Sequence, residues 1–470
     1  MESRMPSRTL LALVLALALP ISPALAGDRD SDDSKSGKKE KPLDLEKASF
    51  RELYAEFKKE HVRLAETFKS KDVPTDEEGR DYAYAKKVLI KMAEKGTRDA
   101  CTKICEVLET KTLANPELQA HAFEAQREAL SKLPKDSAGF KHMLRLAKKR
   151  SDWRRRIDII YALRLLEDED SEEQLLDMIT EKRPEYVGLA AIRALGFRKS
   201  VKAVDKIIRV LRKHEPDVDR TYLDCRQSLT AITGYDRATS REWKELWKKL
   251  GEEKFTQKQR GKDRLFFPRK LVMTDRLALL LDTSASMRLR DPLAGAAAPA
   301  EGGTGSTVRN PGGDGKTSLP KERERLFRGK EHARGMLLTL RKKGRFNLFH
   351  FNRRAYAWLE EGQLARVADG MIDTALDYIK NYKPRGLSLV DEGFKRVFLN
   401  DKIDTIYFYS DGVPSGRKGE RQPYLPLLAE IRNLNRWKGM RIFSVGFKGI
   451  DRKFMVEVAR ENGGTYIEVP

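Results

Sequence analysis

Apolar residues recur at helical spacing from Asp44 to about Leu250, with charged and polar residues between them. A recurrence every three or four residues predicts a succession of amphipathic helices. Within this stretch a small residue followed by leucine returns in steps of 33, 32 and 34 residues, at Ala129-Leu130, Ala162-Leu163, Ala194-Leu195 and Ser228-Leu229. Each step fits two helices joined by a polar turn. One such hairpin cannot bury its own apolar face, so the hairpins should stack. An irregular helical bundle is the alternative.

The pattern changes after Leu250, where short apolar runs alternate with helical stretches. The apolar runs are "RLALLLD", "FNLFHF", "TIYFYSDG", "MRIFSVGF" and "TYIEV", and helices are expected near 322–342, 364–382, 389–398, 424–437 and 454–462. Apolar strands separated by helices are typical of a parallel sheet that helices cover on both faces. The predicted fold is therefore multidomain, with an all-α solenoid followed by an α/β doubly wound domain.

Changes in composition place the boundaries of these parts. Residues 1–26 contain two arginines, an apolar run and small residues at the end, which is typical of a cleaved secretory signal peptide. The protein is therefore expected to be secreted or periplasmic, and no later apolar window is long enough to span a membrane. The other predicted parts are a disordered linker at 27–43, the helical domain at 44–250, a connection at 251–270, and an α/β domain at 271–470 with a flexible insertion at 288–320.

Lys and Arg outnumber Asp and Glu by 93 to 71, which gives a net charge of +22. An exported protein with this charge is expected to meet anionic polysaccharide, lipid phosphate or an acidic partner rather than nucleic acid. The alternative is a solvated basic surface without a specific ligand. The three cysteines are an odd number and do not form a disulfide framework, so we expect buried free thiols.

One basic cluster lies in the segment "RLAKKRSDWRRR", where Trp153 stands among seven cations. Cations gathered around a helical turn are able to bind phosphates or sulfates. A solvated corner of the helical domain would explain the same cluster, because charge runs are commonly only surface. The candidate polyanion-binding residues are Arg145, Lys148, Lys149, Arg150, Arg154, Arg155 and Arg156.

The main chemical signal lies in "RLALLLDTSASM", where an apolar run ends in Asp282 and is followed by Ser284 and Ser286. Asp411 occupies a similar strand end in "YFYSDGVPSG". Because ligands of open sheets bind beyond the carboxyl ends of the strands, these side chains should meet there. Carboxylate and hydroxyl oxygens suit a hard cation such as Mg²⁺. Neutral serine ligands would leave the ion under-neutralised, so that it attracts a further carboxylate from outside.

The segment "DTSAS" resembles the D-x-S-x-S motif of von Willebrand factor A domains, which forms their metal-ion-dependent adhesion site. "SDGVPSG", "RIFSVGFKG" and "VARENGGTYIEV" are similar to later segments of that family. The resemblance covers roughly Asp275 to Val469 and implies a Rossmann-like fold. It also implies a Mg²⁺ site, with Mn²⁺ or Ca²⁺ as other candidates, in which Ser284 and Ser286 bind the ion directly and Asp282 and Asp411 act mostly through waters.

Two points of the resemblance are less direct. Ser388 in "KPRGLSLVDEG" takes the place of the family's threonine ligand, although Leu387 replaces a glycine of that loop. In the helical region, the segment from Gly188 to Leu211 resembles a HEAT-type repeat in its small residues, its turn and its Ile/Val-rich second helix.

No catalytic constellation is visible, because the six histidines are scattered and Ser284 is not in a G-x-S-x-G elbow. The first hypothesis is therefore a non-enzymatic exported scaffold. Its A domain would bind an acidic side chain of a protein ligand through Mg²⁺, and its helical repeats would hold a second partner. The alternatives are a metal-assisted hydrolase or a subunit of a metal-chelating complex, and a vestigial metal site whose basic surroundings bind envelope polyanions.

Overall fold

The computed structural model describes residues 43–67, 76–107, 115–180, 185–251, 274–290, 322, 324–340, 343–447, 450 and 452–469. The predicted signal peptide, the linker up to residue 42, and most of the connection and of the insertion lie outside these residues. Residues Asp44–Pro470 form one compact unit. None of the helices in the described part of the chain combines the length and the apolar character needed to cross a lipid bilayer.

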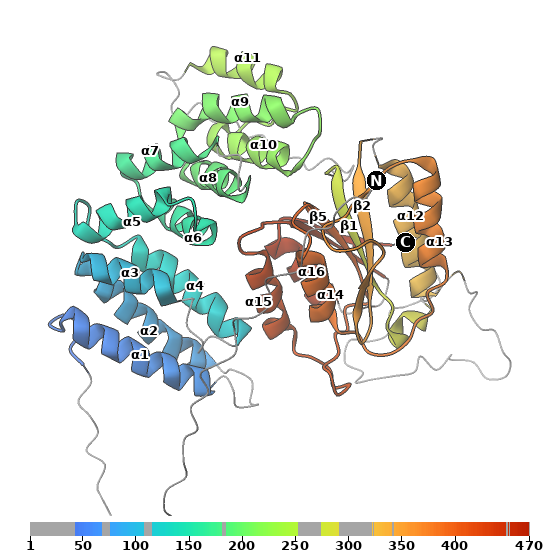
Figure 1. The fold of residues 1–470 in the computed structure, drawn as a ribbon, viewed down its shortest axis with the longest axis horizontal. Coiled ribbons are helices and arrows are strands. Elements are labelled where there is room, and N and C mark those ends of the chain that lie inside the picture. The colour runs from blue at the N-terminus through green and yellow to red at the C-terminus, as the bar shows by residue number, and fades with distance from the viewer. Residues whose placement is uncertain are drawn as a thin grey trace, which may run out of the picture. The chain divides into compact units, whose positions relative to one another are not determined.

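The N-terminal part of this unit is helical, as predicted (Figure 1). Its helices are α1 (Phe50–Thr67), α2 (Asp76–Glu94), α3 (Arg98–Glu106), α4 (Pro116–Leu130), α5 (Ala138–Lys148), α6 (Trp153–Leu163), α7 (Glu169–Met178), α8 (Glu185–Arg198), α9 (Val204–His214), α10 (Arg220–Thr233) and α11 (Ser240–Leu250).

The four small–leucine pairs lie in α4, α6, α8 and α10, which pack against one another in succession. The small residues allow this packing. A Cβ atom at Gly196 of α8 would lie 2.7 Å from the Cβ atom of Ser228 of α10, so two larger residues would push the helices apart. Ser228, the small residue of the fourth pair, therefore lies where the first helices of two successive hairpins touch. Their assignment to the HEAT type stays a prediction.

The C-terminal part contains a seven-stranded sheet in the order β3-β2-β1-β5-β6-β7, with β4 also paired to β2. The central pairs are parallel, as predicted, but β3 and β4 are antiparallel to β2. The prediction of a helix from residue 364 was therefore too long, because β4 comes first and α13 begins at residue 369. The strands are β1 (Arg276–Asp282), β2 (Arg345–Phe351), β3 (Ala355–Ala357), β4 (Ala365–Arg366), β5 (Thr405–Tyr409), β6 (Arg441–Gly446) and β7 (Tyr466–Glu468).

Helices cover both faces of the sheet (Figure 1). One apolar core lies between the sheet and the helices α12 (Arg325–Thr339) and α13 (Asp369–Lys380). The other lies against α14 (Val390–Phe398), α15 (Tyr424–Asn435) and α16 (Arg452–Glu461). Strand β1 explains why both faces are covered, because Leu279 and Leu281 enter the first core while Leu280 enters the second. A strand that is apolar on both sides must be buried on both sides.

A buried aspartate joins the helices to the amino-end edge of the sheet. Asp404 precedes β5, and its carboxylate accepts a hydrogen bond from Arg276 Nε of β1 at 2.7 Å. The guanidinium of Arg220, on α10, lies 3.5 Å from the same carboxylate and also donates to the carbonyl oxygen of Lys438 at 2.6 Å. Arg220 and Asp404 are almost fully buried. Charges removed from water in this way need a partner, and here each domain supplies one arginine.

A second buried aspartate, this one on the helical side, is also bound by one arginine from each domain. Asp224 of α10 accepts a hydrogen bond from Arg193 Nε of α8 at 2.9 Å and lies 3.4 Å from Arg441 Nη2, at the start of β6. Arg193 also donates to the carbonyl oxygen of Gly439 at 3.0 Å. A Cβ atom at Gly439 would lie 1.9 Å from the Arg193 guanidinium, and Gly439 has φ +56°, so only glycine fits. The α15–β6 turn is therefore shaped for contact with the helices.

Asp158 of α6 gives the same interface a pH dependence. Trp437 Nε1 donates to Asp158 Oδ1 at 3.2 Å, and burial raises the pKa of Asp158 to about 6, against the opposing charges of Arg436 and Arg127. Because the folded pKa lies above the unfolded value, this carboxyl favours the folded state at low pH, and the benefit is lost as the pH rises from about 4 to about 6.

We predict that Asp158→Asn becomes more stable relative to the wild type as the pH rises from 4 to 7, by about 3 kcal/mol at most. The asparagine does not titrate and keeps an oxygen for Trp437. Urea unfolding of both proteins at several pH values measures the difference. The exposed Asp205→Asn on α9 is the control. A difference from wild type that stays constant over this pH range would contradict the prediction.

Candidate metal-binding site

The carboxylate of Asp282 lies at the carboxyl end of β1, between β2 and β5, and is fully buried. Its Oδ2 accepts hydrogen bonds from the hydroxyls of Ser388 at 2.7 Å and Ser410 at 2.8 Å. Its Oδ1 accepts a hydrogen bond from the backbone N–H of Ser284 at 2.8 Å. Three segments that are distant in sequence therefore meet at one carboxylate, because β1 is central in the sheet.

Ser284 and Ser286 lie in the turn that follows β1, with Ser286 inside the short 3₁₀ helix η4 (Ala285–Arg288). Their hydroxyl oxygens are 3.1 Å apart. Ser284 is buried and Ser286 is half-buried. The two hydroxyls thus lead from the buried Asp282 toward the surface at the rim of the sheet.

Asp411, two residues after β5, is also fully buried. Its Oδ1 accepts a hydrogen bond from the backbone N–H of Val413 at 3.3 Å, and its Oδ2 lies 3.4 Å from Arg325 Nη1. Arg325 is the first residue of α12, and 11% of its side chain is exposed. One cation from a helix therefore partly balances the second carboxylate of the site.

Backbone hydrogen bonds hold the loops of the site together. The N–H of Ala285 donates to the carbonyl oxygen of Gly386 at 3.0 Å, which ties the serine turn to the loop that carries Ser388. The N–H of Ser415 donates to the carbonyl oxygen of Ser388 at 2.9 Å, which ties that loop to the segment after Asp411. The oxygen atoms are thus positioned by the fold as well as by their own side chains.

The electrostatics of the site favour a divalent cation. Burial and the negative charge of Asp411 raise the pKa of Asp282 to about 6, and the Ser284 and Ser388 hydrogen bonds oppose the rise. Two buried carboxylates with one arginine leave one negative charge in excess, and a divalent ion would turn this into one positive charge. The donors are all oxygen atoms, as hard cations require. The residues present therefore fit Mg²⁺.

The structure brings together all five residues predicted for the metal site, Asp282, Ser284, Ser286, Ser388 and Asp411. Their role as ligands stays a prediction. Sequence reasoning missed Ser410 as a partner of Asp282, although its place at the end of an apolar strand beside Asp411 was a usable signal. It also missed Arg325, which follows the long insertion in the sequence and carries no local signal.

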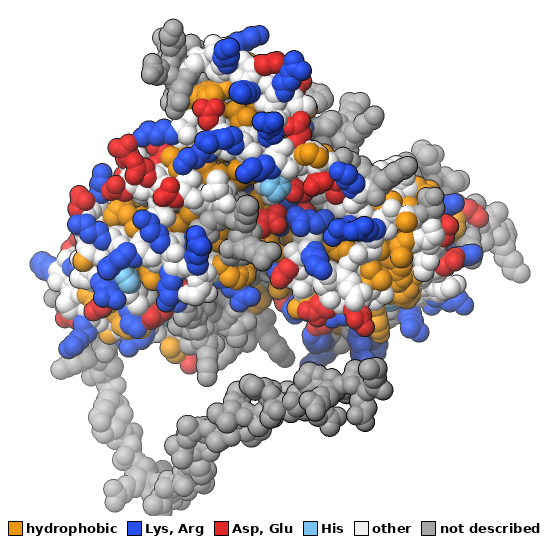
Figure 2. Space-filling model, turned by 45° about the horizontal axis from the view of Figure 1, so that its top comes forward, with side chains coloured by type: hydrophobic (Ala, Val, Ile, Leu, Met, Phe, Trp, Pro, Cys, Tyr) orange, Lys and Arg blue, Asp and Glu red, His pale blue; other side chains and the backbone are white. Residues whose placement is uncertain are grey.

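The predicted polyanion cluster is not a single surface. Arg156 is 1% exposed and donates to the carbonyl oxygen of Ala147 at 2.6 Å, so this residue is corrected to a structural one. Arg155 lies 3.2 Å from Asp152, and Arg154 lies over the Trp437 ring at 4.9 Å. The remaining four, Arg145, Lys148, Lys149 and Arg150, are exposed. Figure 2 shows Lys and Arg side chains distributed over the visible face with acidic side chains between them. The three cysteines are buried and free, as predicted.

Comparisons with known proteins bear on the α/β domain. No family model matches the chain. The human von Willebrand factor A domain-containing protein 3B is 27% identical over 130 residues, which are 27% of this chain and 9% of that protein. The chain thus spans only about a tenth of that relative's length.

Solved structures give weaker similarities. A von Willebrand factor type A protein from Catenulispora acidiphila is 13% identical, covering 41% of this chain and 38% of its own, with a TM-score of 0.30. The PilB minor pilin from Streptococcus sanguinis is 12% identical, covering 41% of this chain and 56% of its own, with a TM-score of 0.27.

The doubly wound sheet and the oxygen side chains at the carboxyl ends of its central strands define the class of this α/β domain. With the D-x-S-x-S motif at the end of β1 and the human relative, the C-terminal part of the chain is a von Willebrand factor A domain. Such domains are generally non-catalytic modules that bind protein ligands.

Proposed function

We propose that this A domain binds an acidic side chain of a protein ligand through a divalent ion, with Mg²⁺ first and Mn²⁺ or Ca²⁺ as alternatives. The observation that supports the proposal is the convergence of Ser388, Ser410 and the serine turn on the buried Asp282. A bound Mg²⁺ would supply a coordination position for the ligand carboxylate. Ser284 and Ser286 would hold the ion directly, and Asp282 and Asp411 would hold it mostly through waters.

The charge of the site favours an acidic ligand. Asp282 and Asp411 carry two negative charges. The guanidinium of Arg325, 3.4 Å from Asp411, offsets one of them. With a divalent ion the site is positive by one charge, and the half-buried Ser286 keeps it accessible at the rim. A partner's Asp or Glu would complete both the coordination and the charge balance.

The protein as a whole is proposed to be an exported, non-enzymatic scaffold, on the basis of the leader at 1–26 and the class of its A domain. The helices α8 and α10 contact the A domain through Arg193 and Arg220. A second protein partner of the helical region would therefore use helices of the other row, such as α5, α7 and α9.

Affinity capture tests the proposal. We expect wild-type protein to retain partner proteins from an envelope extract in Mg²⁺ and to lose them in EDTA. The double variant Asp282→Ala/Asp411→Ala should retain none in either buffer. The exposed pair Asp373→Ala/Asp377→Ala on α13 removes the same charge away from the site and should behave as wild type. Capture that survives both EDTA and the Asp282/Asp411 change would refute the adhesion-site proposal.

A further inference from the structure

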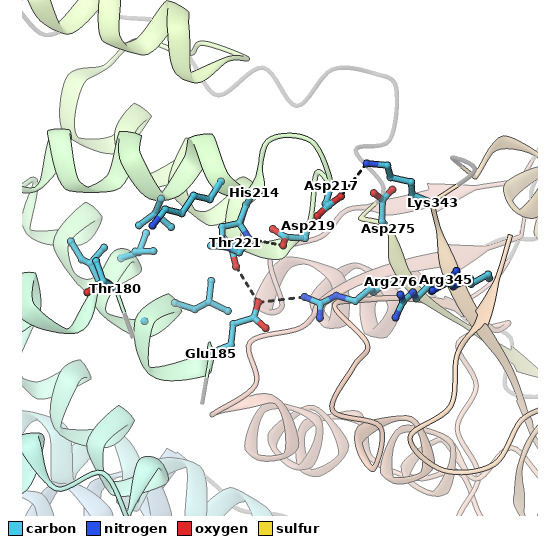
Figure 3. A pocket seen from close by; sticks show the side chains of 17 residues that line it. Thr180, Glu185, His214, Asp217, Asp219, Thr221, Asp275, Arg276, Lys343 and Arg345 are labelled. Carbon is cyan, nitrogen blue, oxygen red and sulfur yellow. Dashed lines mark hydrogen bonds and ion pairs between the residues drawn. The ribbon is translucent and has the colours of Figure 1, made fainter. Parts of the chain in front are cut away.

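A cleft of about 760 Å³ lies at the edge of the sheet opposite to Asp282, where strands β1 and β2 begin (Figure 3). One wall consists of residues at the amino ends of the A-domain strands, including Arg276 and Arg345. The other wall consists of residues from the α7–α10 region, including Leu189 and His214. The volume is typical of a pocket for a small organic ligand.

Three arginines stand in a row along the A-domain wall. Arg345 of β2 is in register with Arg276 of the parallel strand β1 and directly opposite Arg366 of the antiparallel strand β4. Residues in register on neighbouring strands point to the same face of a sheet, and like charges directly opposite each other are unfavourable. Figure 3 shows Arg276 and Arg345 side by side in the cleft. Negatively charged groups beside the three arginines would therefore reduce the repulsion between them.

Three of the four acidic residues that line the cleft lie against its own cations, and the fourth, Asp275, is buried. Glu185 lies 3.3 Å from Arg276, and Asp404 behind the cleft takes the same guanidinium at 2.7 Å. Asp217 lies 3.6 Å from Lys343.

His214 pairs with a further acidic residue of the cleft, because its Nδ1 atom lies 2.7 Å from the carboxylate of Asp219. By contrast, three exposed cations that line the cleft have no acidic side chain within 4.0 Å among the described residues. They are Lys213, Arg345 and Arg366.

The facing wall is apolar in part. Ile179, Leu189, Ile192 and Val210 line the cleft from the helical side. A ligand that reaches the arginines therefore also passes along aliphatic side chains. Removal of such surface from water favours a ligand with an apolar body.

We propose that this cleft binds a phosphate monoester with an apolar body. The phosphate would lie between Arg345 and Arg366, with Lys213 across the cleft. Arginine forms paired hydrogen bonds to phosphate, and a dianion with three terminal oxygens has acceptors for two guanidinium groups. A carboxylate has two oxygens, which one guanidinium satisfies. The site is separate from the metal-binding rim and does not depend on it.

Titration calorimetry on the full chain with n-hexyl phosphate tests the proposal. We expect binding that the double variant Arg345→Gln/Arg366→Gln weakens about 10- to 100-fold. Inorganic phosphate should bind at least about tenfold more weakly than n-hexyl phosphate, because it lacks the apolar body. The control variant Arg241→Gln/Arg334→Gln removes two exposed cations, on α11 and α12, and should bind as wild type.

A second measurement needs no variant. n-Hexyl phosphate should protect Arg345 and Arg366 of the wild type from phenylglyoxal, as read by peptide mass spectrometry. Vesicles of phosphatidylcholine with and without phosphatidic acid distinguish the sources of the phosphate. Binding to the phosphatidic acid vesicles would indicate a lipid headgroup, whereas binding of n-hexyl phosphate alone would indicate a free ester. The proposal is overturned if neither binds, if the control variant loses as much affinity, or if the two arginines are not protected.

Discussion

Asp282→Asn is expected to weaken Mg²⁺ binding about 10- to 100-fold while leaving the fold intact. The carboxylate of Asp282 gathers Ser284, Ser388 and Ser410, and an uncharged amide neither attracts the ion nor accepts all three hydrogen bonds. The metal-free variant should be no less stable than the wild type above pH 6, because burial and the charge of Asp411 raise the pKa of this carboxyl to about 6.

Two measurements check this prediction. Titration calorimetry with Mg²⁺ gives the affinity, and the melting temperature with and without Mg²⁺ shows whether binding stabilises the folded state. The wild type should melt higher in Mg²⁺, and Asp282→Asn should lose this increase. Asp373→Asn, on the exposed side of α13, is the matched control. An unchanged Mg²⁺ affinity in Asp282→Asn would show that the rim does not hold the ion.

The variant Arg220→Met should lower the free energy of unfolding by about 3–5 kcal/mol, because it removes one of the two arginines that balance the buried Asp404 and leaves only Arg276. Arg220 is 1% exposed, lies 3.5 Å from Asp404, and stands 5.1 Å above the Tyr186 ring. Methionine replaces the aliphatic stem but neither the charge nor the donor to Lys438.

Urea unfolding measures this loss, and Arg209→Met on the exposed face of α9 should change stability by less than about 0.5 kcal/mol. Asp404→Asn alone should also destabilise. The two changes together should cost less than the sum of the single effects, since both remove the same interaction. Simple additivity would mean that Arg220 and Asp404 do not act on each other.

The meeting of these oxygen side chains at one edge of the sheet could be predicted from sequence, because its signals are local. Asp282, Ser284 and Ser286 occupy alternate positions at the end of an apolar strand. Residues so near in sequence also lie near one another in the folded protein. Asp411 follows a second apolar strand, and the parallel sheet brings both ends to one edge. Ser388 needed the family resemblance, because its loop is positioned by backbone hydrogen bonds to the loops around it.

The contact between the two domains could not be predicted. Asp404, Arg276 and Arg441 each begin or precede a strand, where a charged residue usually means only a strand end near water. The burial of Asp404 and Arg441 depends on a helix that lies more than 40 residues earlier in the chain. The same limit explains Arg156, whose side chain is covered although Arg154, two residues earlier in the same basic run, is exposed.

The two antiparallel edge strands were missed for a different reason. β3 and β4 contain three and two residues, too few for an alternating pattern to be recognised. β4 nevertheless places Arg366 beside Arg345, so a short edge strand adds a positive charge to the cleft.

Strand β1 begins at Arg276, which donates a hydrogen bond to Asp404, and ends at Asp282 on the opposite edge of the sheet. A tensile load on a partner at the rim would therefore travel along the strand axis toward the helices. Hydrogen bonds to β2 and β5 cross that axis, so they would share the force in shear rather than open one by one. Such a load would thus pass from the rim at one end of the central strands to the contact with the helices at the other end.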